Sequence, residues 1–270
     1  YYTPGGDFSL NGETGGGYGT PTQEMVESYE LATGGFPDWS EWHGTTTKTP
    51  PYELLEPRFH ASVLYNGAQW KGRSIEPFVG GADGWCQWNL DREPKGRTTT
   101  GYYLRKMVDE THDVIAYGGG VQPLMILRYA EVLLNKAEAC YRLDMSAEAN
   151  EAVKAVRARV GLPYTDKGGS ALWDAIRQER KVELAFEGLW YWDLRRWRVA
   201  HKQYPEGLTG YQLHGLKIEK NSDGTFTYSY VSVDDQNRNF PERMYRFPMP
   251  SGELNNNGAV TQYKEWQYDQ

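Results

Sequence analysis

The chain has 270 residues, enough for one large domain or two small ones, and its 29 Lys and Arg against 36 Asp and Glu give a net charge of −7. This balance, without any run of basic residues, argues against nucleic-acid binding, and no apolar stretch approaches the roughly 20 residues that span a bilayer. Two cysteines, Cys86 and Cys140, are too few for a disulfide framework and lack the spacing of a zinc site.

The first half of the chain is rich in glycine and in turn residues. Residues 1–20 read as loop, and a short helix is predicted over 21–30 with Thr22 as its N-cap. Residues 57–76 alternate apolar and polar around Asn66-Gly67, which predicts a β-hairpin. From 76 to 121 little periodicity is found, and the one strand candidate is 102–108.

Helices dominate the middle of the chain. Apolar residues recur at helical spacing over 123–143 and 147–160, and the short turn between these two helices makes them antiparallel. A third helix is predicted over 170–187, with a break at Gly188 and a shorter helix to about residue 200. A second hairpin is expected around the turn at 221–224, and prolines keep 245–250 extended.

Two helical hairpins of this length predict a mainly α fold with a tetratricopeptide-like scaffold, an irregular loop-rich region and short β-hairpins. We expect one structural domain with three parts: a loop-rich, aromatic-rich ligand-binding region (1–122), the two helical hairpins (123–200), and a C-terminal hairpin with an extended segment (201–270). Such arrays need about three repeats to bury a continuous core, so a further helical part is expected upstream or on another chain. The start at Tyr1, without an initiator Met or signal peptide, suits a processed product or a fragment.

Several segments resemble a known family in its own order. They are 21–24 (PTQE), 57–59 (PRF), 127–139 (LRYAEVLLNKAEA), 150–163, 176–188 (IRQERKVELAFEG), 192–197 (WDLRRW) and 245–250 (YRFPMP). The resemblance is to the SusD/RagB nutrient-binding lipoproteins. Full members are about twice as long and carry the lipid-anchored cysteine in an N-terminal half, so this chain resembles their C-terminal portion. The family's usual C-terminal Gln-Asn-Pro-Gly-aromatic run is replaced here by 262–266 (QYKEW).

The resemblance implies a surface-exposed protein of the Gram-negative outer membrane that serves polysaccharide utilisation, such as that of starch. It implies capture of oligosaccharides, or of peptides in some members, and delivery to a TonB-dependent transporter of the SusC type. The implied partners are thus an oligosaccharide, a SusC-like transporter and the missing N-terminal half. No enzymatic activity, cofactor, metal or nucleic acid is implied.

Tryptophans in loops are the candidate sugar-binding residues, because an indole ring stacks on the C–H face of a pyranose while polar groups fix its hydroxyls. Two pairs lie in Gly- and Pro-flanked loops, and one further ring follows the first hairpin turn. These candidates are Trp39, Trp42, Trp70, Trp85 and Trp88. The alternative is that the paired rings plug the loops onto the scaffold and that Trp70 packs across the hairpin.

A second group of tryptophans lies at helical spacing, which favours core packing. They are Trp173, Trp190, Trp192 and Trp197. On the third helix, Glu179, Glu183 and Glu187 share one face at i, i+4 and i+8, where like charges repel unless compensated. We expect an Arg–Glu network that ties the helix pairs together. Available arginines are Arg157, Arg180, Arg195 and Arg196.

Two other functions remain open. A glycoside hydrolase would use two of these glutamates as an acid/base pair about 5–10 Å apart in an open cleft. A helical-repeat scaffold for a protein partner would bind through a concave helical groove, with the tryptophan loops packed shut. The five histidines are scattered, and the acidic run 234–239 suits a solvated turn better than a Ca²⁺ site.

Overall fold

The computed structural model describes residues 3–7, 16–17, 19–87, 97–117, 125–205, 212–236 and 238–267. The chain forms two compact units. The larger unit contains residues 1–187 and 213–235, and the smaller unit contains residues 188–212 and 236–270. This division differs from the three parts expected from the sequence, because the loop-rich region, the three longest helices and the second hairpin all belong to the larger unit.

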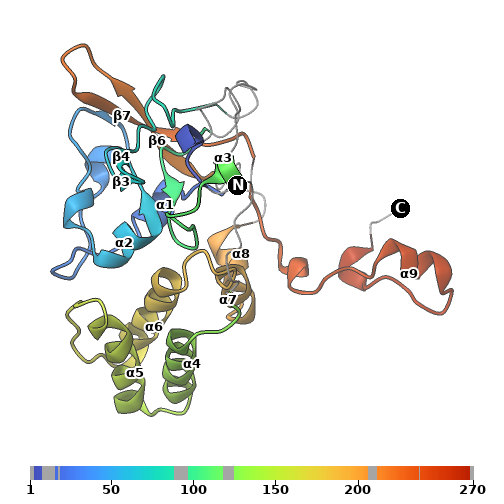
Figure 1. Cartoon of the computed structure of the whole chain (residues 1–270). Helices are drawn as coiled ribbons and strands as arrows, with labels where there is room; N and C mark the ends of the chain where they lie inside the picture. The colour runs from blue at the N-terminus through green and yellow to red at the C-terminus, as the bar shows by residue number, and fades with distance from the viewer. Residues whose placement is uncertain are drawn as a thin grey trace. The chain divides into compact units, whose positions relative to one another are not determined.

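Three helices form one layer of the larger unit (Figure 1). They are α4 (Tyr129–Arg142), α5 (Ser146–Ala158) and α6 (Gly169–Glu183). Small residues such as Ala137, Ala149 and Ala152 let the helices approach closely, and Leu172 and Ile176 of α6 fill the space between them. The three predicted helices are therefore confirmed, although α4 begins later and α6 ends earlier than expected. The predicted start at 123–124 lies outside the described residues.

The hairpin predicted over 57–76 is wrong in its first arm. Residues Pro57–Ser62 form helix α2, because proline suits a first helical turn and Phe59 and Ser62 share a buried face while Ala61 is exposed. Only Val63–Leu64 (β2) is extended, and it pairs antiparallel with Tyr103–Leu104 (β5). The turn at Asn66-Gly67 is present, and beyond it Gln69–Trp70 (β3) pairs with Arg73–Ser74 (β4).

The second hairpin is confirmed and forms most of a three-stranded antiparallel sheet in the order β1-β7-β6. Its strands are β1 (Thr45–Thr46), β6 (His214–Lys220) and β7 (Phe226–Ser232). Alternation puts Leu216, Ile218 and Tyr228 on the buried side. Helix α1 (Gln23–Val26) lies against β6, and Thr22 caps it through its hydroxyl as predicted.

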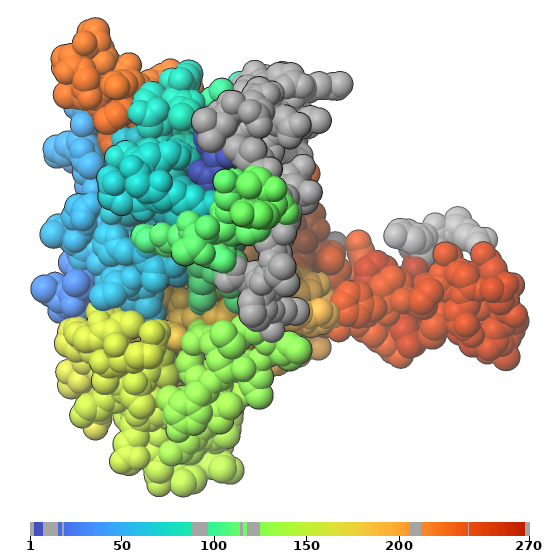
Figure 2. All heavy atoms as spheres, in the orientation of Figure 1, coloured from blue at the N-terminus to red at the C-terminus, as the bar shows by residue number. Residues whose placement is uncertain are grey.

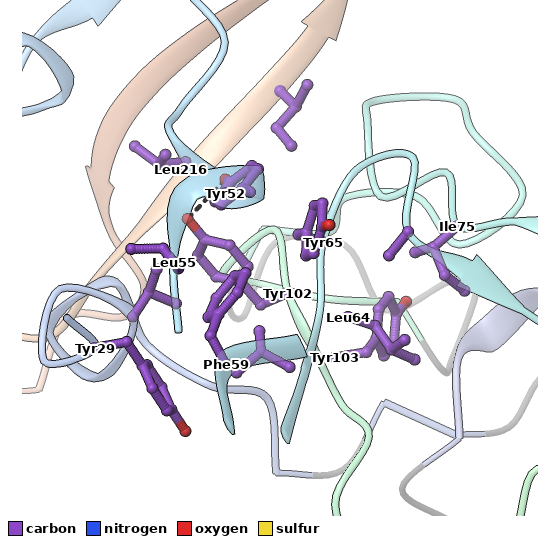
Figure 3. Close-up of a cluster of buried hydrophobic side chains, with 14 of the residues drawn as sticks. Tyr29, Tyr52, Leu55, Phe59, Leu64, Tyr65, Ile75, Tyr102, Tyr103 and Leu216 are labelled. Carbon is purple, nitrogen blue, oxygen red and sulfur yellow. Dashed lines mark hydrogen bonds between the residues drawn. The ribbon is translucent and has the colours of Figure 1, made fainter. Parts of the chain in front are cut away.

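An aromatic core joins these elements (Figure 3). Tyr52 stacks on Phe59 with ring centroids 5.7 Å apart, and its hydroxyl lies 2.9 Å from that of Tyr102. Tyr102 in turn donates to the Gln23 side chain at 2.6 Å. Burial raises the pKa of both Tyr52 and Tyr102 far above that of a solvated phenol, so these hydroxyls stay protonated and act as buried hydrogen-bonding links.

The remaining elements are short. In the larger unit they are η2 (Ser40–Trp42), η3 (Tyr52–Leu54) and α3 (Val114–Tyr117). In the smaller unit they are α7 (Trp190–Arg196), α8 (Ala200–Gln203), η4 (Glu242–Tyr245), α9 (Ser251–Asn256) and η5 (Lys264–Trp266). A small core of Leu194, Ala200 and Phe240 joins α7, α8 and η4. Within the described part of the chain, no helix has the length and apolar character needed to cross a membrane.

Candidate functional site

Two of the candidate tryptophans lie in the core rather than at the surface. Trp70 is 1% exposed and Trp39 is 6% exposed. The indole N–H of Trp70 donates to the Asp7 carboxylate at 2.9 Å, which anchors the N-terminal segment against β3. The exposed rings expected at these two positions are therefore not found, and their contact with a sugar stays a prediction.

Trp42 and Trp85 are half-buried, and each ring keeps some accessible surface. Trp42 packs edge-on against Trp39 at a centroid distance of 5.6 Å, and its N–H donates to the Lys48 carbonyl at 2.9 Å. Trp85 forms an isolated β-bridge with Thr98. Trp88 lies outside the described residues. Each of the two loop pairs, Trp39 with Trp42 and Trp85 with Trp88, therefore has at least one partly accessible ring, that of Trp42 or of Trp85.

Next to Trp42 the structure brings together three rings that we call the His–Tyr–His stack: His43, Tyr230 and His214. The Tyr230 ring lies 4.3 Å from His214 in a stacked arrangement and 4.8 Å from His43 in a tilted one. His43 follows η2, His214 begins β6, and Tyr230 lies on β7 between them in space. Segments almost 190 residues apart in the sequence thus form one aromatic surface on the β1-β7-β6 sheet.

Carboxylates from α1 and the adjoining turn hold both histidines. The Glu27 carboxylate lies 2.8 Å from His43 Nε2, and the Glu24 carboxylate lies 2.7 Å from His214 Nδ1. Glu24 also accepts a hydrogen bond from the backbone N–H of His214 at 3.0 Å. The rings are thereby fixed in orientation, and each carries a polar edge beside an apolar face. This arrangement offers stacking surface together with hydrogen-bonding groups, which is the chemistry that a sugar ring needs.

Sequence reasoning missed this stack because its histidines seemed scattered. Two signals were present: His43 directly follows Trp42, and Tyr230 belongs to the alternating strand of the second hairpin. Neither signal shows that β1, β7 and β6 bring the two histidines to opposite sides of one tyrosine. That proximity depends on strand pairing between distant segments.

The expected Arg–Glu network is present and lies deep in the larger unit. Glu179 accepts from Arg157 at 3.0 Å and also from Arg58. Glu183 accepts from Arg128 at 2.6 Å and from Arg159 at 3.0 Å. Of the four arginines offered by the sequence, Arg157 is the one for which a bond to these glutamates is found among the described residues. The others have different partners: Arg180 donates to Asn135, Arg196 pairs with Asp193, and Arg195 lies among the rings of the smaller unit.

The charges in this network determine the ionisation of its carboxyls. Burial alone would raise the pKa of Glu183, but hydrogen bonding and charge from Arg128, with the charges of Arg159 and Arg58, hold it below its usual range. Glu187 behaves in the same way, since Arg128 and Lys106 outweigh its burial. Glu183 and Glu187 are therefore ionised at neutral pH and bound to fixed cations.

The same geometry excludes these glutamates as a glycosidase acid/base pair. Glu187 accepts from Arg128 and from Lys106, the latter at 2.6 Å, and Glu179 and Glu183 are each bound by two or more arginines. An acid catalyst needs a raised pKa and access to the glycosidic oxygen. Glu179 and Glu183 are almost wholly buried, and the pKa of Glu183 is lowered.

Core packing was expected for the helical tryptophans, but three of them are half-buried and pack against other rings. Trp173 stacks on Tyr141 at 5.3 Å, and Trp190 packs against Trp197 at 5.9 Å. Trp192 is different: 53% of its surface is exposed, beside Phe247 in the smaller unit. The core assignment is thus wrong for Trp192.

No metal centre is seen in the described ranges, which contain no group of three or more His, Cys, Asp or Glu side chains placed to hold an ion. Within the acidic run 234–239, residue 237 lies outside them. Within the described residues, neither Cys86 nor Cys140 forms a disulfide. The candidate site is the His–Tyr–His stack on the β1-β7-β6 sheet, which offers aromatic faces and polar groups.

Comparison with known proteins identifies the family. The SusD family profile matches residues 2–266. Two curated relatives from Formosa agariphila are SusD-like protein P38, 37% identical over 87 residues (28% of this chain and 17% of the relative), and SusD-like protein P2, 39% identical over 95 residues (30% and 18%). The matched segments therefore span less than a fifth of the length of these relatives.

Solved structures agree over most of the chain. A SusD-like protein from Bacteroides fragilis superposes with a TM-score of 0.74 at 27% identity, covering 92% of this chain and 47% of that one. A second B. fragilis structure, described as a SusD-like carbohydrate-binding protein, gives a TM-score of 0.65 at 25% identity and covers 87% and 47%. The chain thus spans about half the length of these structures, and the predicted tetratricopeptide-like fold class is confirmed. By the match across nearly its whole length, the chain belongs to the SusD family.

Proposed function

We propose that this chain is the C-terminal part of a cell-surface protein that binds oligosaccharides, with the His–Tyr–His stack and Trp42 as a contact surface. The observation that carries the proposal is the juxtaposition of His43, Tyr230 and His214 beside a half-buried tryptophan, with Glu24 and Glu27 at their edges. A pyranose presents a C–H face to such rings and hydroxyls to the carboxylates. The related B. fragilis structure described as carbohydrate-binding supports this reading.

Trp42 directly precedes His43 of the stack in the chain, and Trp85 is the other partly accessible candidate. Trp42 is held in place by its N–H bond to Lys48 and by its edge contact with Trp39, so Trp39 contributes indirectly by supporting Trp42. A ring that is already fixed loses little conformational freedom when a sugar binds.

Affinity electrophoresis of the intact protein against a polysaccharide panel tests this site. Tyr230→Ala and Trp42→Ala should each reduce retardation by the recognised polysaccharide. Trp173→Ala is the matched control, because it removes another half-buried stacked ring from the helical layer, away from the sheet. Retardation that is unchanged in both site variants would remove this surface from the binding site, provided that circular dichroism shows them folded.

Binding without cleavage is the proposed activity, since the glutamates suited by spacing to hydrolysis are locked to cations. Incubation with the recognised polysaccharide should release no reducing ends, and steady release above a no-protein control would contradict this. We further propose location on the outer membrane surface and delivery of the sugar to a SusC-type transporter. Co-purification of such a transporter with the tagged protein tests the latter partner.

We also propose that the exposed start of α4 packs against a helical part of the same protein outside residues 1–270. Ile126 is 87% exposed and Tyr129 is 73% exposed, and Met125, Leu127 and Val132 are exposed beside them. Figure 2 shows α4 at the surface of the molecule (green to yellow-green). Helical pairs of this type bury such faces against neighbouring pairs. Tyr129→Asp should lower the melting temperature of the intact protein by several degrees, whereas an unchanged value would contradict the contact.

A further inference from the structure

The larger unit contains a pocket of about 380 Å³ at one end of the Arg–Glu network. This volume falls in the range of roughly 300–1,000 Å³ typical of small-molecule sites. One part of its wall is apolar and comes from Pro57, Ala61, Val160 and Val182. The rest comes from Ser62 and from the charged residues Arg58, Lys106, Arg128, Arg159 and Glu183. Four cations and one carboxylate thus face the same space.

Charge is unevenly distributed along the network. Four cations line the pocket, and the carboxylates that they meet there are those of Glu183 and Glu187. Arg58, one of these cations, also binds Glu56 and Glu179, and Arg157 binds Glu30 and Glu179 away from the pocket. Among the described residues the network as a whole has five cations and five carboxylates, so the positive excess is local to the pocket.

Arg159 is the cation best placed to bind a ligand. Its side chain is 58% exposed, and the bonds found for it within the described ranges run only from Nη2 to Glu183. Glu183 already accepts from Arg128 and Arg58 as well, so its charge is more than compensated. The Nη1 and Nε groups of Arg159 are therefore donors that a ligand carboxylate can take without breaking the network.

We propose that this pocket is a subsite for a sugar unit that carries a carboxylate, that is, a uronic acid. Its carboxylate binds Arg159 and supplies the negative charge that the pocket end of the network lacks. The apolar wall around Pro57 and Val160 accepts the C–H face of the ring. The choice of a sugar rests on the proposed glycan binding, whereas the preference for an anion rests on the pocket alone.

Isothermal titration calorimetry of the intact protein tests the proposal with methyl glucuronide, methyl glucoside and methyl glucoside 6-sulfate as probes. The glucuronide should bind more tightly than the other two, and its affinity should fall as salt is raised. Arg159→Met should weaken it about tenfold or more, since a charge-assisted hydrogen bond is lost. Lys154→Met is the control: it removes an exposed positive charge from α5, whose C-cap is Arg159, five residues away, and should leave the affinity unchanged.

Several outcomes would overturn the inference. They are equal binding of the neutral glucoside, an Arg159→Met variant with unchanged affinity for the glucuronide, a preference for the sulfate, or no binding of the glucuronide at all. Failure of the sheet surface would be seen separately, because Tyr230→Ala and Trp42→Ala are judged with polysaccharide retardation. Arg159→Met leaves those rings untouched, so a failure of one proposal can be told apart from a failure of the other.

Discussion

Replacing Arg157 by Met should destabilise the larger unit strongly. The guanidinium of Arg157 binds the Glu30 carboxylate through two bonds of 2.7 and 2.8 Å and also donates to Glu179 at 3.0 Å and to the Pro163 carbonyl at 2.9 Å. Methionine keeps the length and packing of the side chain but removes every one of these donors.

The magnitude follows from what is left behind. Loss of one partner from a buried ion pair costs about 3–5 kcal/mol, because an uncompensated charge stays out of water. Glu179 keeps Arg58 after the substitution, whereas Glu30 loses its two bonds to Arg157. We therefore expect the lower end of this range, a loss of about 3 kcal/mol in the free energy of unfolding.

Urea denaturation of the intact protein followed by circular dichroism measures this loss. Arg177→Met is the matched control, because Arg177 forms an exposed i, i+3 pair with Asp174 whose removal should cost less than about 1 kcal/mol. A double variant, Arg157→Met with Glu30→Gln, should recover part of the loss by removing the stranded charge. If Arg157→Met costs no more than Arg177→Met, the network is not holding these segments together.

Three further predictions concern the same unit. Gly215→Val should lower the melting temperature by several degrees, since a Cβ there would lie 2.4 Å from the Cα of Thr100, and an unaltered value would show that the strand can shift. Lowering the pH should destabilise the fold through Glu183. Despite its burial, its arginine partners hold its folded pKa below that of a solvated glutamate, so its stabilisation is present above the solvated pKa and is lost as the pH falls through the folded pKa. Glu183→Gln should flatten that pH dependence in urea titrations, and an equally steep slope would contradict the assignment. Trp70→Phe should cost about 1.5–3 kcal/mol by removing the bond to Asp7, as measured by chemical denaturation.

Much of the helical part could be predicted from the sequence, because helical periodicity and capping residues can be recognised within a short stretch of chain. Periodicity identified α4, α5 and α6, and Thr22 identified the start of α1. The failure at 57–62 has a local cause as well: the alternation of Phe59, Ala61 and Val63 fits a strand as well as it fits one helical turn. Proline at the first position favours a helix, but the sequence alone does not decide between the two. The structure shows a helix, in which Phe59 and Ser62 share the buried face.

The candidate site was much less predictable, because its geometry depends on contacts between distant segments. The glutamates on α6 indicated an ionic network, but Arg58 and Arg128 could not be chosen over Arg180 or Arg195 without knowing which side chains face inward. Trp39 and Trp42 lie in the same loop, yet Trp39 is buried and Trp42 is half-buried. Side-chain burial in a loop is determined by what packs over it, and that is not encoded at short range.

The buried network and the ring surface have complementary roles in this fold. Buried ion pairs contribute little net stability because desolvation offsets their attraction, but their directional bonds favour one arrangement of the segments that carry them. Here four segments are joined. They are the turn after α1 (Glu30), the start of α2 (Arg58), the end of α5 (Arg157) and the second half of α6 (Glu179). The same α1 segment carries Glu24 and Glu27, which orient the histidines of the stack. A charge-neutral replacement of the whole network by apolar residues should therefore retain a folded protein yet weaken sugar binding, because Glu24 and Glu27 would no longer be held in register with the sheet.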